Sequence, residues 1–291
     1  MKRHFDSRWM LIFSMIMFGT LGPFVRLIAL PSGALALCRA LLAAAMIGLF
    51  LFLKKEKLSL STIKKELPLL LLSGAAMGFN WILLFEAYKY TTVSVATLTY
   101  YFAPVLVTLA CPLLFKEKMG AKQWICFGMS TLGILLITGI GPLSAGSNHF
   151  LGILFGLGAA CLYATVILLN KFIKTVGGLQ RTFLQFLAAI LVLLPYVGFS
   201  GGVPLGALNR AGWVCLLIVG LLHTGVTYCL YFTSLKDLSG QKAAILSYID
   251  PLVAVLLSVT LLGEPLSLPQ IIGGLLILGF TLWNEINPSK K

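Results

Sequence analysis

Long apolar runs alternate with short polar breaks along the whole chain. A helix that crosses a bilayer needs about 20 mainly apolar residues, and most of these runs have that length. The pattern therefore predicts an all-α polytopic membrane protein with ten transmembrane helices, in which Pro68 and Pro269 lie in first helical turns. We expect the helices near residues 9–29, 33–53, 67–88, 93–115, 121–139, 150–171, 180–199, 211–233, 242–262 and 268–285.

The composition agrees with a lipid environment. Hydrophobic residues make up 59% of the 291 residues and charged residues only 11%. Soluble domains carry about 25% charged residues, so this chain has too few charges to cover a surface that faces water. The lipid bilayer is accordingly the first expected partner.

The distribution of positive charge predicts the orientation of the chain. If the N-terminus lies in the cytoplasm, 18 of the 22 Lys and Arg residues fall in cytoplasmic segments. The external segments hold only Arg26, Lys89 and Arg210, and Arg39 falls within the second helix. Cytoplasmic loops are enriched in Lys and Arg, so both termini are expected in the cytoplasm of a bacterial cell. The formal net charge of +13 then reflects topology, and no nucleic-acid partner is expected.

One phrase occurs twice in the sequence. YFAPVLVTLACPLLFKE covers residues 101–117, and YIDPLVAVLLSVTLLGE covers residues 248–264, at an offset of 147. Gly78, Phe85, Ala96 and Gln123 have identical partners at the same offset. The repeating unit is five helices, and an odd number of spans inserts the second copy upside down. We therefore expect two inverted repeats, residues 1–140 and 149–291, joined by an external loop at 141–148.

Two inverted halves predict a mechanism as well as an architecture. Related packings of similar halves can open toward either side of the membrane, with the substrate site in a central cavity near the midplane. The N-terminal basic and apolar stretch could be read as a signal peptide, but its removal would break the repeat. We interpret it as the retained first helix.

The sequence resembles the drug/metabolite transporter superfamily in its ten-helix EamA-like branch. The features that carry the resemblance are the two repeated phrases, the glycine-rich helices near 121–139 and 268–285, and Arg39 in LCRALLAAAM. The resemblance covers nearly the whole chain. It implies secondary transport of small organic metabolites, among them amino acids, sugars, nucleobases and drugs.

Asp250 is the clearest difference between the two phrases, because the first copy has Ala103 at this position. A carboxylate inside the bilayer is costly and usually faces a cavity, so Asp250 is a candidate for substrate binding and for carrying a proton. The alternative is a structural one. Asp followed by Pro is also typical of a helix start, where Asp250 would cap the helix before Pro251.

Matched polar and aromatic residues extend the predicted site. Polar side chains in spans should face the interior of the bundle, either to contact substrate or to bond neighbouring helices. Tyrosines within spans would suit a planar or amphipathic substrate, or they could simply pack in the core. Together with Asp250, the candidate substrate-binding residues are Asn80, Trp81, Tyr101, Tyr163, His223, Thr227, Tyr228 and Tyr248.

Other residues are candidates for charge and for helix geometry. Arg39 could hold a substrate carboxylate or form a structural ion pair with Glu86, and His223 is a second proton candidate. Pro104 and Pro251 are expected to kink the helices near 93–115 and 242–262. Glu117 and Glu264 are expected to anchor loops at opposite faces.

These observations favour a secondary transporter over other classes. No Walker motif is present, and no cofactor or metal site is expected from six dispersed cysteines and three histidines. An enzyme is not expected. The predicted function is alternating-access transport of a small metabolite, with an amino acid or related zwitterion as the expected substrate. The alternative is a channel, a scaffold or a transporter of a different class of solute such as sugars, nucleobases or drugs. The protein could be a monomer or a homodimer.

Overall fold

The computed structural model describes residues 6–55, 60–115, 119–138, 148–235, 238 and 246–286. All regular secondary structure within these ranges is helical. Residues 141–147 of the predicted external loop and Glu117 lie outside them. The helices are α1 (Ser7–Gly19), α2 (Leu21–Arg26), α3 (Ser32–Leu53), α4 (Leu60–Tyr90), α5 (Val93–Tyr100), α6 (Ala103–Phe115), α7 (Ala121–Thr138), α8 (Asn148–Phe172), α9 (Gly178–Phe199), η1 (Leu205–Ala207), α10 (Arg210–Leu217), η2 (Ile218–Val226), α11 (Thr227–Ser234), α13 (Ile249–Thr260) and α14 (Leu268–Ile286).

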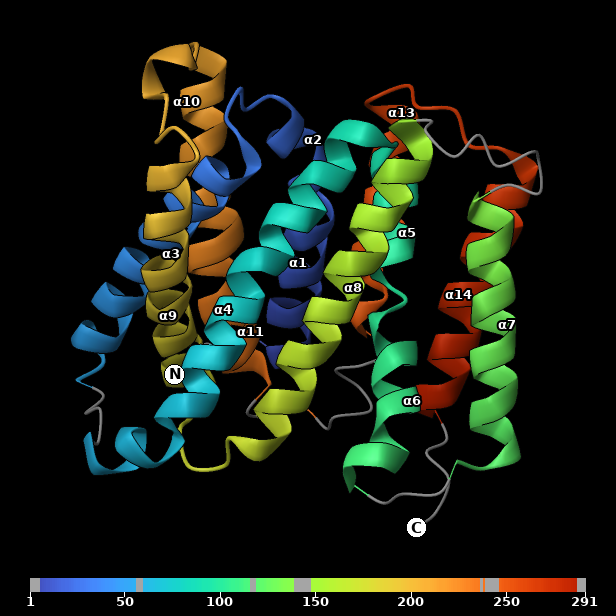
Figure 1. Cartoon of the computed structure of the whole chain (residues 1–291), viewed down its shortest axis with the longest axis horizontal. Helices are drawn as coiled ribbons and strands as arrows, with labels where there is room; N and C mark the ends of the chain where they lie inside the picture. Colours follow the sequence, from blue (N-terminus) through green and yellow to red (C-terminus); the bar gives the residue numbers. More distant parts are fainter. Residues whose placement is uncertain are drawn as a thin grey trace.

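Seven helical stretches in the described part of the chain are long and apolar enough to cross a membrane. They are Ser7–Arg26, Ser32–Leu53, Ile63–Tyr90, Val93–Leu114, Asn148–Phe172, Gly178–Phe199 and Arg210–Ser234. Three shorter apolar helices accompany them: Ala121–Ile137, Ile249–Thr260 and Leu268–Asn284. The chain is thus an all-helical polytopic membrane protein, and the helices lie side by side across its width (Figure 1).

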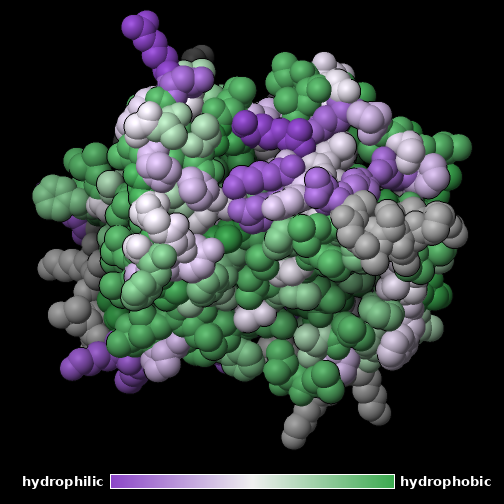
Figure 2. All heavy atoms as spheres, turned by 45° about the horizontal axis from the view of Figure 1, so that its top comes forward, coloured by the Kyte–Doolittle hydropathy of each residue, from purple (hydrophilic) through white to green (hydrophobic). Residues whose placement is uncertain are grey.

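The side wall of the molecule is apolar. Figure 2 shows hydrophobic residues over most of this wall, and hydrophilic residues gathered across the end that faces forward in that view. Large apolar side chains such as Phe52, Leu113 and Phe199 are mostly exposed. Exposed apolar surface this extensive marks a membrane-contacting protein, because soluble monomers rarely expose large patches.

At one edge of the molecule, α7 and α14 pack with their backbones in close approach (Figure 1). A Cβ atom on Gly133 would lie 2.6 Å from the carbonyl oxygen of Gly273, and a Cβ atom on Gly273 would lie 2.5 Å from that of Gly133. Small residues allow membrane helices to pack in this way. By contrast, a Cβ atom on Gly128 would meet no neighbouring atom within 4 Å.

Both repeated phrases contain a helix break three residues before their proline. α5 ends at Tyr100, and a turn at Tyr101 and Phe102 separates it from α6, in which Pro104 is the second residue. A turn at Tyr248 precedes α13, in which Pro251 is the third residue. A proline ring clashes with the carbonyl four residues earlier, so the break falls upstream of each proline. The expected kinks in continuous helices are therefore breaks.

The stretch Arg210–Ser234 contains a π-helical segment, η2. Two threonine hydroxyls donate to carbonyl oxygens five residues back: Thr224 Oγ1 in η2 to Val219 O, and Thr227 Oγ1 at the start of α11 to Leu222 O, both at 2.7 Å. π-helical turns are rare and often occur at functional sites. The wider turn also rotates side chains away from the faces that an α-helical period predicts.

Candidate substrate cavity

A cavity of about 250 Å³ lies among the helices. Its wall draws on α1, α2, α3, α4, α5, α6, α8, α11 and α13 together with the turns at Tyr101 and Tyr248, so segments distant in sequence meet there. Eight aromatic side chains line it: Phe18, Trp81, Tyr88, Tyr100, Tyr101, Tyr163, Tyr228 and Tyr248. A cavity of this size, mostly aromatic with a few polar groups, is typical of a small-molecule site.

The aromatic wall is ordered by ring contacts. Tyr100 and Tyr163 stack with ring centroids 5.1 Å apart, and Tyr101 meets Tyr100 edge-on at 6.3 Å. On the other side, Phe18 and Tyr228 meet edge-on at 5.2 Å. These offset and edge-on geometries stabilise aromatic pairs and fix ring orientation. The wall therefore offers flat apolar faces with phenolic hydroxyls at their edges.

Asp250 supplies a carboxylate to the cavity. It lies in the first turn of α13, and its Oδ2 accepts a hydrogen bond from Tyr101 Oη at 2.7 Å. No side chain caps α13, so the predicted capping role of Asp250 is not seen. The hydrogen bond instead joins the break before α13 to the break between α5 and α6.

Arg39 supplies a guanidinium to the same cavity from α3. Only 3% of the residue is exposed. Its Nε donates to Thr224 Oγ1 at 2.7 Å, and its Cζ lies 4.7 Å from the ring centroid of Trp81. The suggested ion pair with Glu86 is not formed, because Glu86 Oε1 pairs with Lys89 Nζ at 3.2 Å near the surface.

The two buried charges do not neutralise each other. Neither Arg39 nor Asp250 forms an ion pair in the described part of the chain. Buried charges normally pair, because isolating them from water is costly. The cavity therefore holds one positive and one negative group that a ligand could satisfy.

Six of the predicted binding residues line the cavity: Trp81, Tyr101, Tyr163, Tyr228, Tyr248 and Asp250. Three do not. Asn80 lies behind the wall, where its Nδ2 donates to Ala159 O at 2.6 Å. His223 Nε2 contacts Thr20 Oγ1 at 2.7 Å, and Thr227 donates within η2 and α11. These three side chains are buried and bond to neighbouring groups, and they are not among the residues that line the cavity.

Sequence reasoning did not single out Phe18, Thr97 and Ser247, which also line the cavity. Thr97 carries a signal that could have found it. It lies one helical turn before Tyr101, so both share one face of the segment that leads to the break. Phe18 and Ser247 carry no comparable signal, because an apolar ring or a serine within a span is ordinary.

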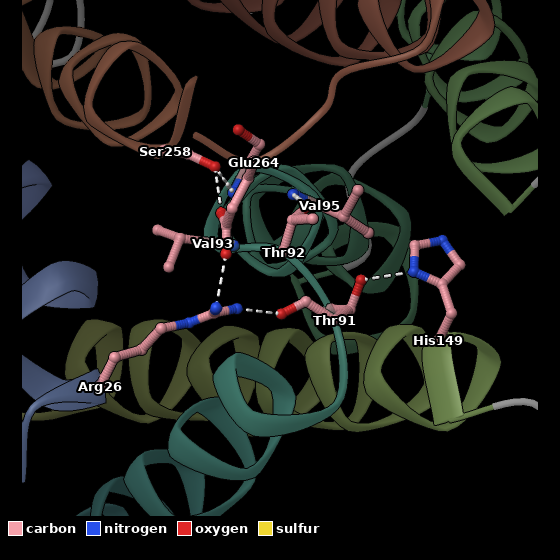
Figure 3. A network of polar contacts seen from close by, with 9 residues as sticks. Arg26, Thr91, Thr92, Val93, Val95, His149, Ser258 and Glu264 are labelled. Atoms are coloured by element: carbon pink, nitrogen blue, oxygen red, sulfur yellow. Dashed lines mark hydrogen bonds and ion pairs between the residues drawn. The ribbon is translucent and has the colours of Figure 1, made fainter. Parts of the chain in front are cut away.

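A polar network joins several loops and helix ends (Figure 3). At its centre Glu264, 9% exposed, pairs through Oε1 with Arg26 Nη1 at 2.6 Å. Its Oε2 accepts from the backbone N–H of Val93 at 2.8 Å and from Ser258 Oγ. This carboxylate thus ties α2 and the start of α5 to the loop after α13.

The network extends to two further elements. Arg26 Nη2 donates to Thr91 O at 2.6 Å, and Thr91 Oγ1 lies 2.8 Å from Nδ1 of His149 at the start of α8 (Figure 3). Tyr88, which lines the cavity, is three residues before Thr91. The network therefore joins α2, the start of α5, the start of α8 and the loop after α13 close to a residue that lines the cavity. Glu264 anchors its loop as predicted, and it also holds a guanidinium.

Residues 8–139 and 150–284 match the sequence profile of the EamA-like transporter family. The chain belongs to this family. The family and the names of its members indicate a membrane transporter rather than an enzyme.

Relatives of this EamA-like protein share most of its length. The uncharacterized transporter YxxF of Bacillus subtilis is 33% identical over 273 residues, covering 92% of this chain and 85% of that protein. An uncharacterized transporter of Archaeoglobus fulgidus is 31% identical, covering 68% and 70%. Protein PecM of Dickeya dadantii is 26% identical, covering 81% and 78%. A crystal structure of a protein with 17% identity covers 96% of both chains with a TM-score of 0.65, which shows a shared fold.

Proposed function

We propose that this EamA-like transporter carries a small organic metabolite, an amino acid or related zwitterion, across the cytoplasmic membrane by alternating access. The observation that carries the proposal is the aromatic cavity with Arg39 and Asp250 on its wall and no ion pair between them. A zwitterion would bring a carboxylate to the cation and an ammonium to the anion. Desolvating both buried charges would then be compensated within one small site.

The contacts between α5 and α13 support an inverted arrangement of two five-helix halves. Val93 at the start of α5 bonds Glu264 after α13, and Ser94 bonds Ser258 near the end of α13. At the other end, Tyr101 after α5 bonds Asp250 at the start of α13. The two segments therefore run in opposite directions, as halves inserted with opposite orientation require. The two family matches also fall on the two proposed halves.

The positions of surface cations support a topology with cytoplasmic termini. Arg26 and Lys89 lie at the end of the molecule that carries the network around Glu264, and this end would be external. Lys54 follows α3 and Lys171 lies near the end of α8, at the opposite end (Figure 1). A greater number of cations at that end fits the cytoplasmic side. In this orientation the network around Glu264 closes the external side.

Transport of radiolabelled L-phenylalanine in proteoliposomes tests the function, with an amino-acid mixture and a sugar or nucleobase as competitors. A carrier gives saturable uptake that rises when unlabelled substrate is present on the trans side. Unsaturable flux without trans-stimulation would indicate a channel. Saturable flux of a sugar or nucleobase alone would replace the proposed substrate class while keeping the carrier.

A further inference from the structure

The π-helical segment η2 packs unusually close to α3. A Cβ atom on Gly220 would lie 2.6 Å from Leu42 Cβ, and one on Gly225 would lie 2.7 Å from Met46 Cβ. Leu42 and Met46 follow Arg39 by three and seven residues, so all three lie on one face of α3. The two glycines therefore let η2 approach the face that carries the buried guanidinium.

Between these glycines, Thr224 meets Arg39 in one defined orientation. The hydroxyl of Thr224 has a single hydrogen, and it donates this hydrogen to Val219 O at 2.7 Å. An oxygen lone pair is left for Arg39 Nε, which donates to it at 2.7 Å. The bond to Val219 O spans five residues, which is the spacing of a π-helical turn. This turn therefore fixes the orientation of the Thr224 hydroxyl and, through it, the position of the Arg39 guanidinium.

This contact uses one of the five N–H donors of the guanidinium. The other four, on Nη1 and Nη2, have no hydrogen-bond partner among the residues that the structure describes, and Arg39 lines the cavity. Trp81 and Phe85 cover the guanidinium, with their ring centroids 4.7 and 5.6 Å from Cζ. Rings that stack on a guanidinium leave the donors in its plane free, and a carboxylate can accept two of them in parallel.

We propose that Thr224, held by the π-helical turn, is a positioning residue that aims Arg39 at a carboxylate group of the transported molecule. The inference rests on the proposed transport function and adds which residue binds the carboxylate of the substrate and which residue positions that guanidinium. A single guanidinium matches a single negative charge, and Asp250 matches a cationic group on the same ligand. The apolar body of the ligand lies against the tyrosines.

Three probes of similar size separate the two charged ends. L-phenylalanine has both charges, 3-phenylpropionate has only the carboxylate, and 2-phenylethylamine has only the ammonium group. Their binding to the purified full chain is measured by calorimetry or thermal shift for the wild type, Thr224→Val and Thr224→Ser. The matched control is Thr182→Val, since Thr182 is buried and its hydroxyl donates to Gly178 O of its own helix at 2.9 Å.

We expect Thr224→Val to weaken binding of L-phenylalanine and 3-phenylpropionate roughly tenfold, the size of one lost hydrogen-bond contribution. Binding of 2-phenylethylamine stays within about twofold, Thr224→Ser restores the wild-type values, and Thr182→Val leaves all three probes unchanged. Equal weakening of all three probes by Thr224→Val would show a general structural role and overturn the proposal. Wild-type affinity of Thr224→Val for L-phenylalanine would also overturn it.

A wild-type protein that binds none of the three probes would likewise overturn the assignment of Arg39 to a carboxylate. That failure is distinct from failure of the proposed function. Saturable, trans-stimulated flux of an uncharged solute would support the carrier function and overturn the assignment of Arg39 to a carboxylate. Flux without saturation would contradict the carrier function, and the binding of the three probes would still decide the role of Arg39.

Discussion

Two ionisable side chains, Arg39 and Asp250, define the chemistry of the cavity. A charged side chain at the centre of a membrane-spanning helix costs about 2.5–3.5 kcal/mol on insertion scales. Arg39 recovers part of this cost through Thr224 and Trp81, and Asp250 recovers part through Tyr101. Neither recovers it through an ion pair in the described structure. Buried charges that lack a charged partner within the protein are typical of a site that binds a charged ligand.

Asp250→Asn tests whether this carboxylate carries a proton. We expect the variant to lose uptake driven by a pH gradient while it keeps exchange of substrate for substrate, because an amide cannot take up and release a proton between pH 5 and 8. The measurement is proteoliposome flux with and without an imposed gradient. Asp6→Asn is the control, since asparagine caps a helix as well as the aspartate that now caps α1. Unchanged gradient-driven uptake in Asp250→Asn would remove the proton role.

At the residue scale, a sequence is most informative where a polar group stands out against an apolar span. Tyr163, Tyr228 and Asp250 could be placed on the cavity because lipid penalises their polar atoms. His223 and Thr227 are not among the residues that line the cavity, and the local helix geometry offers a reason. Their spacing predicts one face of an α-helix, whereas the π-helical segment η2 has more residues per turn and shifts side chains off that face.

At the scale of elements, helix breaks and close contacts between helices determine the arrangement of the bundle more than the lengths of the helices do. The sequence predicts the stretches that cross the membrane well, because apolar runs are long and separated by charges. The prediction that Pro68 lies in a first helical turn is wrong, because α4 begins at Leu60 and Pro68 lies inside it. The same prediction for Pro269 is confirmed, since it is the second residue of α14. A proline within a helix is tolerated where neighbouring groups can compensate for the lost backbone bond.

The contact between α7 and α14 is sensitive to a single methyl group. Gly133→Ala places a Cβ atom 2.6 Å from the carbonyl oxygen of Gly273, and we expect a loss of about 1–3 kcal/mol of stability. Gly128→Ala on the same helix has open space around it and should be neutral or slightly stabilising. Thermal unfolding of both variants in the same detergent measures the difference. Equal melting temperatures would contradict the observed close approach.

At the scale of the whole molecule, the cavity lies where the beginning of one repeated phrase meets that of the other. Tyr101 and Asp250 come from the beginnings of the two phrases, three residues before Pro104 and one residue before Pro251, and they are hydrogen-bonded to each other. The sequence offset predicts the repeat, and an odd number of helices in each unit would invert the second copy. The bond between Tyr101 and Asp250 is consistent with a meeting of the two phrases. The network around Glu264 could not be predicted in this way, because Arg26 and Thr91 have no regular spacing from Glu264 in the sequence.

Opening of the proposed external side should require separation of Arg26 from Glu264. In a background without native cysteines, Thr97→Cys reports access to the cavity through its reaction with a membrane-impermeant thiol reagent added outside. We expect Glu264→Gln to raise the labelling rate several-fold, since a neutral amide cannot form an ion pair with the guanidinium. Lys89→Gln is the control, because it breaks an exposed ion pair at the same end that contributes about 0–1 kcal/mol. An unchanged rate in Glu264→Gln would argue against this closure.

The balance of charge in the cavity also bears on what drives transport. Moving one elementary charge through a membrane potential of 100 mV changes its energy by about 2.3 kcal/mol. One guanidinium and one carboxylate face the ligand, so a zwitterion is matched without any surplus charge. Passage of this proposed substrate alone would be electroneutral, and the membrane voltage would exert no direct force on it. The direction of net movement is then set by concentration gradients, of the metabolite itself or of a co-transported ion.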